Sequence, residues 1–322
     1  MHWALEGCGK CSPTELGVLS LAWLLRINVF ELLGAEMRSF IGFAARRMPR
    51  NFIVLLASAA LLYFGCAAYV LHFEVDRFLF RQMPNFVGTT AEATLSFKSD
   101  SGNELLVRRY GEASLGCVVF FPGQHGTLSA YSFSDYSAAG LAVFILAYPG
   151  QDGALGRTEL SEIEGLVAKA LAEIVGACGS SQTVVVGVSL GAMLAAYSVQ
   201  STPVAGLVLS STAPSLSSAI RSRLRSNWAL APLGWLPLSE LLPHDYTLTE
   251  ALMRSPDMHV AIFQGTQDAQ TPIEHLRTPV ARLRNVQLVP VPGGSHSTTF
   301  VSSQSAQLVV IRSMLRLRSE RH

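Results

Sequence analysis

Val184-Val185-Val186-Gly187-Val188-Ser189-Leu190-Gly191 is a valine-rich run that ends in a G-x-S-x-G pattern and continues into an Ala-rich stretch up to Val199. A continuous run of valines is typical of a buried parallel strand, and the Ala-rich stretch favours a helix. A serine on a strained strand-to-helix turn needs glycines two residues away on either side, because the backbones approach closely there. The stretch therefore predicts a strand, a sharp turn and a helix, with the hydroxyl of Ser189 projecting into a cleft.

Two backbone N–H groups near Ser189 are the expected oxyanion hole. The predicted helix begins at Leu190, so its free N–H groups and its dipole point toward negative charge that develops beside the serine. An earlier strand ends in the glycine-bearing loop Phe120-Phe121-Pro122-Gly123-Gln124-His125-Gly126. We expect the N–H groups of Gln124 and Leu190 to be the two donors. His125 as a catalytic base is the alternative, but His125 precedes the serine, and a tight turn beside the hole is the simpler account.

A base and a carboxylate must accompany the serine, because a hydroxyl of high pKa is a poor nucleophile until its proton is taken. His296 follows a predicted strand through the glycine-rich loop Val291–Ser295, so we predict that it is the base. The orienting carboxylate should lie between Ser189 and His296 at the end of a strand. Asp268 fits, because it leaves the strand-like Ala261–Gln264, and its expected task is to hold the imidazole in the right tautomer.

Other histidines and aspartates occupy less suitable positions. His259 opens a predicted strand and is expected to be structural, while Asp245 and Asp257 precede the strand that leads to Asp268. The remaining histidines belong to the N-terminal segment, the stretch before His259, a predicted helix or the terminus: His2, His72, His244, His275 and His322. These motifs imply no metal and no organic cofactor.

Strand and helix signals alternate on both sides of the serine turn. Two alternating runs, Thr94–Ser99 and Glu104–Tyr110, predict an antiparallel hairpin. Short apolar runs typical of buried strands follow at Cys117–Phe121, Ala142–Ala147, Thr183–Val188, Gly206–Leu209, His259–Phe263 and Val286–Val291. Helices are predicted at Thr127–Ala139, Glu159–Val175, Leu190–Val199, Ile273–Leu283 and Thr298–Leu317. This alternation predicts an α/β fold with a mostly parallel, doubly wound sheet and ligand chemistry beyond the carboxyl ends of its strands.

Residues 213–257 interrupt the alternation. They contain five prolines and the closely spaced Arg221, Arg223 and Arg225. We interpret them as a small helical insertion over the sheet edge that shapes a substrate pocket. A long surface excursion without such a role is the alternative.

In this order and spacing the motifs resemble the α/β-hydrolase superfamily, and within it the branch of serine aminopeptidases and monoacylglycerol lipases that includes membrane-anchored members. The resemblance covers about residues 94–317 and rests on FFPGQHG, AYPGQDG with Gly156 after it, GVSLG, GTQDAQTP and GGSH. It implies the α/β-hydrolase fold and leaves the predicted triad intact. In two places the sequence departs from many relatives: Pro122-Gly123 replaces His-Gly at the oxyanion loop, and Gln151 stands where an aromatic residue is often found.

We expect Ser189 to attack an ester, thioester or amide carbonyl and form an acyl-enzyme, which water activated by His296 then hydrolyses. Ester hydrolysis of the carboxylesterase or lysophospholipase kind is the leading prediction, because an active site tethered near lipid favours small-molecule or lipid acyl substrates. A serine peptidase or thioesterase is the enzymatic alternative. A non-catalytic, membrane-bound binding protein of the same fold is the alternative from another class.

Composition limits the partners of this chain. It has 24 basic and 23 acidic side chains and a net charge of +1, so a broad electropositive surface for nucleic acid is excluded. Hydrophobic residues make up 49% and charged residues 15% of the 322 residues, which is apolar for a soluble enzyme. The excess of apolar residues should therefore be local. The sequence leaves the oligomeric state open.

The apolar excess lies in Asn51–Phe73, which has no charged residue over about the 20 positions that a helix needs to cross a bilayer. Arginines precede this run, whereas the charges after it are mixed, so the positive-inside rule predicts a cytoplasmic N-terminus and an exported catalytic domain, periplasmic or extracellular. The expected organisation is a cytoplasmic extension at 1–50, a transmembrane helix or signal anchor at 51–73, a linker at 74–93 and a catalytic domain at 94–322.

Three alternatives concern this N-terminal region. A cleaved signal peptide with small residues at Cys66–Ala68 is one, although the apolar region exceeds the usual length of about 7 to 15 residues. Lipoprotein processing at Gly65-Cys66 is the second, but Tyr63 stands where such signals usually carry an aliphatic residue. Translation from Met48 is the third, and it would make the preceding residues an upstream extension.

The five cysteines are scattered along the chain, at Cys8, Cys11, Cys66, Cys117 and Cys178. An odd, scattered set is not typical of a disulfide framework. Cys8 and Cys11 form C-x-x-C without the second ligand pair of a zinc site or the βαβ setting of a redox motif. Cys117 and Cys178 lie beside predicted strands, and we expect each thiol to act as a small core hydrophobe.

Overall fold

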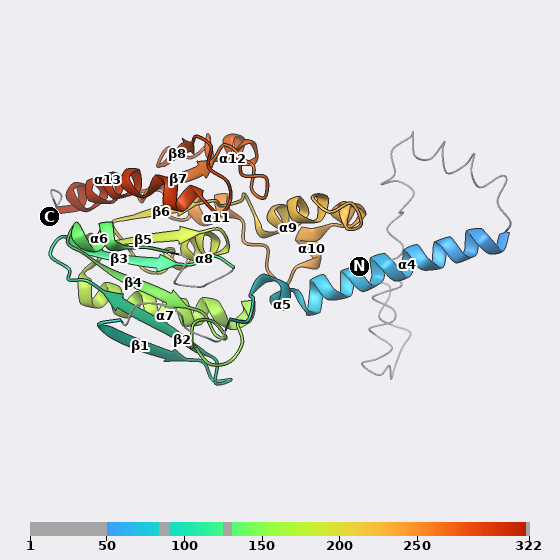
Figure 1. Cartoon of the computed structure of the whole chain (residues 1–322), viewed down its shortest axis with the longest axis horizontal. Helices are drawn as coiled ribbons and strands as arrows, with labels where there is room; N and C mark the ends of the chain where they lie inside the picture. Colours follow the sequence, from blue (N-terminus) through green and yellow to red (C-terminus); the bar gives the residue numbers. More distant parts are fainter. Residues whose placement is uncertain (1–49, 84–90, 125–130, 320–322) are drawn as a thin grey trace, which may run out of the picture. The chain divides into compact units, whose positions relative to one another are not determined.

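The computed structural model describes residues 50–83, 91–124 and 131–319 of the chain (Figure 1). The chain divides after Gly65 into two compact units, and the unit from Cys66 onward contains the whole sheet. The C-x-x-C pair, the candidate start at Met48 and His125 lie outside the described residues.

One eight-stranded sheet forms the centre of the second unit, in the order β1-β2-β4-β3-β5-β6-β7-β8. Its strands are β1 (Ala93–Lys98), β2 (Glu104–Tyr110), β3 (Gly116–Phe121), β4 (Leu141–Ala147), β5 (Thr183–Val188), β6 (Gly206–Ser210), β7 (His259–Gly265) and β8 (Val286–Val291). β1 and β2 form the predicted antiparallel hairpin, and β2 also pairs antiparallel with β4. All the other neighbours are parallel. The predicted mostly parallel α/β sheet is confirmed.

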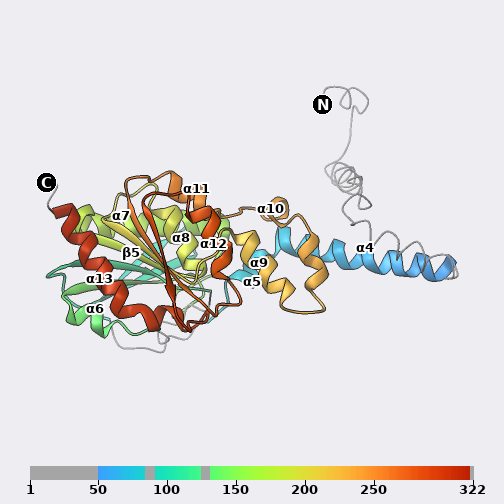
Figure 2. The ribbon, with the colours of Figure 1, turned by 90° about the horizontal axis from the view of Figure 1, so that it is seen from above.

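Helices cover both faces of this sheet (Figure 2). The helices that follow α4 (Arg50–Phe73) are α5 (Val75–Leu79), α6 (Ser134–Ala138), α7 (Leu160–Cys178), α8 (Leu190–Ser198), α9 (Leu216–Arg225), α10 (Leu238–Leu241), α11 (Leu248–Met253), α12 (Ile273–Val280) and α13 (Thr299–Ser319), with short 3₁₀ turns η2 (Ser180–Gln182) and η3 (Ala231–Trp235). Buried side chains of α7 and α8 pack on one face, and those of α6 and α13 pack on the other. The helix expected at Thr127–Ala139 is described only as α6, since 125–130 lie outside the described residues.

Strand β5 shows how the sequence builds a sheet with two covered faces. Val184 and Val186 belong to the cluster that contains α13, whereas Val185 belongs to the cluster that contains α7 and α8. Successive residues of a strand point to opposite faces, and all three valines are fully buried. A continuous apolar run is therefore what this central strand requires.

The stretch between β6 and β7 is helical, as expected for residues 213–257. It contains α9, η3, α10 and α11. Arg221 of α9 donates from Nε to the carbonyl of Gly234 at 3.1 Å and from Nη2 to that of Leu236 at 3.4 Å, which holds η3 against α9. Arg223 donates to the side chain of Gln270 at 3.2 Å. Two of the three closely spaced arginines thus have structural partners.

Helix α4 (Arg50–Phe73) is the one helix in the described part of the chain that is long and apolar enough to cross a membrane. Its best window has a mean hydropathy of 2.1, and none of its residues is buried. A core helix would bury at least one face. By length and composition this helix could cross a membrane, as the sequence predicts for residues 51–73.

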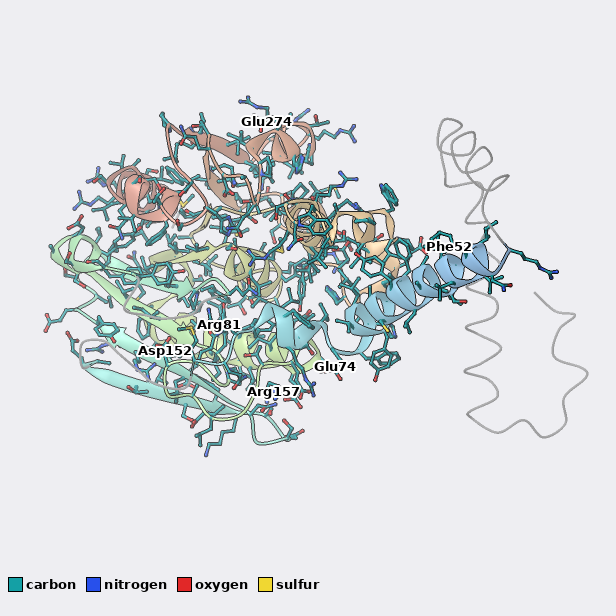
Figure 3. All side chains as sticks on the ribbon, turned by 45° about the vertical axis from the view of Figure 1, so that its right-hand side comes forward. Phe52, Glu74, Arg81, Asp152, Arg157 and Glu274 are labelled. Carbon is teal, nitrogen blue, oxygen red and sulfur yellow. A yellow bond between two sulfur atoms is a disulfide. The ribbon has the colours of Figure 1, made fainter. Side chains whose placement is uncertain are left out.

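The residues that follow α4 were expected to be a linker, but those up to Met83 are packed against the sheet unit. Val75 and Phe80 are buried in the core, with 4% and 2% exposure. The ring of Phe80 lies edge-on to that of Tyr148, with centroids 5.9 Å apart. Met83 forms a parallel bridge with Gln151, beside Arg81 and Asp152, which Figure 3 labels. We call residues 74–83 the juxtamembrane segment, after the membrane span that the sequence predicts just before them.

Cys117 and Cys178 form a disulfide, so the prediction of two separate core-filling thiols is wrong. Cys117 lies near the start of β3, Cys178 is the last residue of α7, and their Cα atoms are 6.3 Å apart. The two residues are separated by 61 positions, and it is the packing of α7 across β3 that brings them together. Cys66 is the free cysteine of the described residues, and it is exposed.

Candidate active site

Ser189 lies on a sharp turn between β5 and α8. Its backbone has φ 54° and ψ −120°, a region that residues other than glycine rarely adopt. Such a conformation costs about 1–3 kcal/mol and persists only where the surroundings hold it. The N–H of Ser189 donates to the carbonyl of Ser210 on the neighbouring strand at 2.9 Å. The turn therefore has the strained geometry that the G-x-S-x-G pattern predicts.

The glycines on either side of Ser189 are required by close backbone contacts. A Cβ atom on Gly187 would lie 2.6 Å from the Cα of Ala192. A Cβ atom on Gly191 would lie 2.2 Å from the carbonyl oxygen of Pro122, in the loop that leads to Gln124. Both distances are well below van der Waals contact, so any larger residue would push α8 away from β5 or from this loop.

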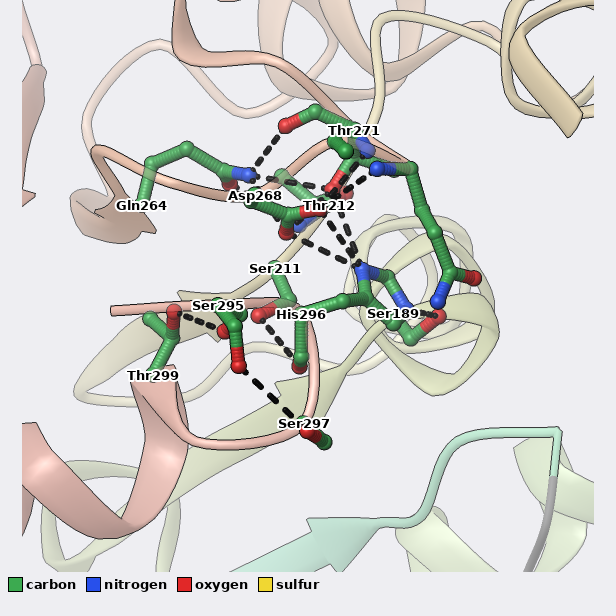
Figure 4. A network of polar contacts seen from close by, with 12 residues as sticks. Ser189, Ser211, Thr212, Gln264, Asp268, Thr271, Ser295, His296, Ser297 and Thr299 are labelled. Atoms are coloured by element: carbon green, nitrogen blue, oxygen red, sulfur yellow. Dashed lines mark hydrogen bonds and ion pairs between the residues drawn. The ribbon is translucent and has the colours of Figure 1, made fainter. Parts of the chain in front are cut away.

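The three side chains predicted to form a triad meet at one edge of the sheet (Figure 4). Ser189 Oγ lies 2.9 Å from His296 Nε2. His296 Nδ1 lies 3.0 Å from Asp268 Oδ2 and 3.2 Å from Oδ1. The residues follow β5, β7 and β8, which are parallel, so their carboxyl ends share this edge.

Asp268 is held by several donors besides His296. The N–H groups of Gln270 and Thr271 each donate to Oδ1 at 2.9 Å, and the hydroxyl of Thr271 donates to Oδ2 at 2.7 Å. Burial is the largest influence on the carboxyl and by itself raises its pKa. The hydrogen bonds from His296 and Thr271, with attraction to the His296 imidazolium, outweigh burial, so the pKa of Asp268 is lowered from its ordinary value. The carboxylate is thus kept ionised next to the imidazole.

Gln264 is a member of this network that sequence reasoning missed. It is fully buried near the end of β7, and its Nε2 donates to Asp268 Oδ2 at 3.1 Å and to Thr271 Oγ1 at 3.0 Å. Its Oε1 accepts from the N–H of Thr212 at 3.1 Å. The available signal was an amide in an otherwise apolar strand, but the sequence does not say which groups that amide would meet.

The loop that carries His296 is tied to neighbouring loops. The N–H of Gln267 donates to the carbonyl of Gly294 at 2.9 Å, and the hydroxyl of Ser211 donates to the carbonyl of His296 at 3.1 Å. A Cβ atom on Gly265 would lie 2.2 Å from the carbonyl oxygen of Gly294. This close packing fixes the imidazole above the end of β7.

The loop that carries Gln124 lies directly beside Ser189. A Cβ atom on Gly123 would be 3.3 Å from the Cβ of Ser189. The hydroxyl of Tyr148 donates to the carbonyl of Pro122 at 3.1 Å, which anchors the loop from below. Leu190 is the first residue of α8, where N–H groups have no acceptor within the helix. The two N–H groups expected to form the oxyanion hole therefore belong to segments that adjoin the serine.

A model of the alpha/beta hydrolase family matches residues 118–310, which is more than half of the chain and includes all three triad positions. The chain belongs to the α/β-hydrolase family. A search of curated proteins finds no significant match.

Solved structures of the α/β-hydrolase fold resemble this chain at low identity. An esterase of Pyrococcus furiosus, Pf2001, has 14% identity and a TM-score of 0.58, with 74% of this chain and 97% of that one covered. A carboxylesterase of Nitrososphaera gargenis has 10% identity and a TM-score of 0.52, with 71% and 100% covered. The esterase RhEst1 of a Rhodococcus species has 15% identity and a TM-score of 0.51, with 70% and 98% covered.

The other histidines and aspartates that were considered as base or carboxylate lie elsewhere in this α/β hydrolase. Asp245 accepts from the N–H and the hydroxyl of Ser217 at 2.8 and 2.6 Å, at the start of α9. His259 is exposed at the first position of β7, and the ring of His244 packs on Tyr246. Among the described residues, no group of three or more His, Cys, Asp or Glu side chains is arranged to hold a metal ion.

Proposed function

We propose that this α/β hydrolase is a serine hydrolase that cleaves carboxylic esters through an acyl-enzyme on Ser189. The observation that carries the proposal is the 2.9 Å distance from Ser189 Oγ to His296 Nε2, continued from His296 Nδ1 to Asp268 Oδ2 at 3.0 Å. A hydroxyl that contacts a base oriented by a buried carboxylate is the arrangement that activates a serine for attack on a carbonyl.

In the first half of the proposed reaction, His296 Nε2 takes the proton of Ser189 as Oγ bonds to the ester carbonyl carbon. The negative charge moves to the carbonyl oxygen, and the N–H groups of Gln124 and Leu190 stabilise it. Each such donor contributes about 3–4 kcal/mol to lowering the barrier. The imidazolium then gives its proton to the leaving alcohol as the carbon–oxygen bond breaks, and the acyl group remains on Ser189.

In the second half, His296 takes a proton from a water molecule as its oxygen attacks the acyl carbon. The second tetrahedral species collapses, Ser189 Oγ leaves with a proton from the imidazolium, and a carboxylic acid is released. Asp268 remains ionised throughout and stabilises the imidazolium in both halves, which is consistent with its lowered pKa.

Esters are preferred over amides and thioesters on two grounds. The solved structures with this fold described above are esterases by name. An active site tethered to a bilayer also meets lipid esters at high local concentration. Turnover of chromogenic esters of increasing acyl length is compared with turnover of aminoacyl anilides and of acyl thioesters. The proposal predicts faster turnover of the esters, whereas a peptidase would prefer the anilides and a thioesterase the thioesters.

Reaction with a fluorophosphonate probe tests the serine mechanism. We expect the full-length protein to be labelled stoichiometrically and Ser189→Ala to lose both labelling and ester turnover, because the hydroxyl that contacts His296 Nε2 is gone. Ser198→Ala is the control, since Ser198 is buried in the same helix and its hydroxyl donates to the carbonyl of Leu194 within that helix. Labelling that persists in Ser189→Ala, or folded wild-type protein that is not labelled, would contradict the proposal and favour a binding protein.

We also propose that α4 anchors the enzyme by a single pass and that the catalytic unit lies on the extracytoplasmic side. The arginines before α4 favour this orientation by the positive-inside rule. The Cys117–Cys178 disulfide supports it independently, since disulfides persist in oxidising compartments and are rare in the cytosol.

A further inference from the structure

Gln151 is a buried polar side chain that the proposed mechanism does not use. Its exposed fraction is 0%. Its Nε2 donates to the carbonyl of Arg81 at 3.1 Å and to the carbonyl of Gln124 at 3.2 Å. One amide group therefore joins the juxtamembrane segment to the residue whose N–H is the proposed oxyanion donor.

A second link connects the same two segments. The side-chain Nε2 of Gln124 donates to the carbonyl of Phe78 at the end of α5. The oxyanion loop is thus bound to the juxtamembrane segment through the backbone carbonyl of Gln124 and also through its side chain.

The juxtamembrane segment is itself firmly placed, so it can serve as a fixed support. The N–H of Met83 donates to the carbonyl of Gly150 at 2.8 Å, and that of Asp152 donates to the carbonyl of Met83 at 2.7 Å. Val75 and Phe80 of the same segment are buried in the core. The carbonyl groups of Phe78 and Arg81 belong to the stretch between Val75 and Met83.

Protein stability alone does not explain why position 151 has an amide side chain. Its Oε1 is buried and has no hydrogen-bond partner in the described part of the chain. A buried acceptor without a partner is costly, and an apolar side chain of similar size would avoid that cost. An apolar residue would not supply the two hydrogen bonds that Nε2 donates.

We propose that Gln151 is a positioning residue that holds Gln124 in place on the juxtamembrane segment, so that the segment following α4 forms part of the support of the oxyanion hole. This inference rests on the proposed function. Oxyanion donors act because they are already aimed when charge develops, and a displacement of about 1 Å in such a site lowers the rate about 100-fold. Loss of the Gln151 links should therefore affect the transition state more than the bound substrate.

Gln151→Leu in the full-length protein tests this role. The number of active sites is first titrated with the fluorophosphonate probe, and rates are then expressed per titrated site. We expect kcat/KM for a chromogenic ester to fall about 10- to 100-fold. The inhibition constant of a boronic acid, which forms a tetrahedral adduct on the serine, should rise by a similar factor. Thr183→Val is the control, because Thr183 is fully buried at the opposite end of β5 and its hydroxyl donates to the carbonyl of Gly179, away from the triad.

Several outcomes would overturn the inference. Wild-type kcat/KM per titrated site in Gln151→Leu, or a loss confined to the number of sites, would show that Gln151 serves folding alone. A loss of rate without weaker boronate binding would show that Gln151 does not act through the oxyanion hole. If Gln151→Leu does not fold, Gln151→Met, which is more flexible, takes the same measurements. Failure of the proposed function would instead appear as wild-type protein that the probe does not label.

Discussion

Asp268 combines complete side-chain burial with a lowered pKa, and the two are reconciled by its hydrogen bonds. A carboxyl group with a lower pKa in the folded state than in the unfolded state binds fewer protons when folded. Its contribution to stability is present above the unfolded-state pKa of about 3.9 and is lost as the pH falls through the folded-state value.

This difference in pKa predicts a pH-dependent contribution to stability from Asp268, which a variant without this carboxyl group lacks. Urea unfolding of wild-type protein should show a free energy of unfolding that decreases as the pH is lowered from about 5. Asp268→Asn has no carboxyl at this position, so its free energy of unfolding should be lower near neutral pH and should fall less steeply in acid. Urea unfolding midpoints are measured over a series of pH values for wild type and Asp268→Asn, with Asp257→Asn as the matched control. Parallel pH profiles for wild type and Asp268→Asn would contradict the assignment.

The sequence was sufficient to select Ser189, His296 and Asp268, because each follows a predicted strand in the order that the chemistry requires, and the structure brings the three together. It was not sufficient to assign Gln264 or Gln151. An isolated glutamine in or after an apolar strand shows only that an amide is buried. Its partners depend on tertiary distances, such as the 3.2 Å from Gln151 to the carbonyl of Gln124.

Among the elements, strands were predicted more accurately than short helices. β5 and β8 have the predicted bounds. β5 is buried throughout, as its apolar run predicts, whereas β8 lies at the edge of the sheet and leaves Gln287 and Pro290 exposed. α5 was not predicted. Its five residues carry too little periodic signal, and a helix of this length depends on tertiary packing, here through Val75. The disulfide between β3 and α7 escaped prediction for a related reason, since it depends on how two elements pack.

The disulfide predicts a measurable contribution to stability. It closes a loop between positions separated by 61 residues, which corresponds to about 4 kcal/mol of stabilisation in the chain-entropy account. The double variant Cys117→Ala, Cys178→Ala should therefore have a free energy of unfolding lower by about 4 kcal/mol. Ester turnover per titrated site should be unchanged, because Cys117 lies near the start of β3 and the triad lies beyond the carboxyl ends of the strands. Cys66→Ala is the control. A double variant as stable as wild type would rule out a stabilising bond.

At the scale of the whole molecule, the clearest sequence signal is the apolar run Asn51–Phe73. The side of a membrane on which the catalytic unit would lie is harder to infer. Charge bias predicts the orientation of the N-terminus, and the balanced charge composition argues against a nucleic-acid partner. Neither reveals how many copies associate, because the contacts between copies are not encoded in length, charge or periodicity.

The proposed topology has a direct test that uses the cysteines. Membranes from cells expressing the full-length protein are extracted at alkaline pH and then denatured and treated with a maleimide that adds visible mass. We expect the protein to remain in the membrane fraction. In a variant with Cys8, Cys11 and Cys66 all replaced by Ala, which leaves only Cys117 and Cys178, we expect the two thiols to react only after reduction. Reaction of both thiols without reduction would mean that the catalytic unit resides in a reducing compartment. Release by alkali would contradict the anchor.

The burial of Val75 and Phe80 affects where the enzyme can be shortened to yield a soluble recombinant form. A truncation at Thr94, where the sequence signals of the hydrolase begin, removes both side chains from the core. Full burial of one such side chain contributes about 1.5–3 kcal/mol, and a typical domain has about 5–15 kcal/mol in total. Cutting just before Glu74 instead would remove the apolar helix and keep the residues that complete the core.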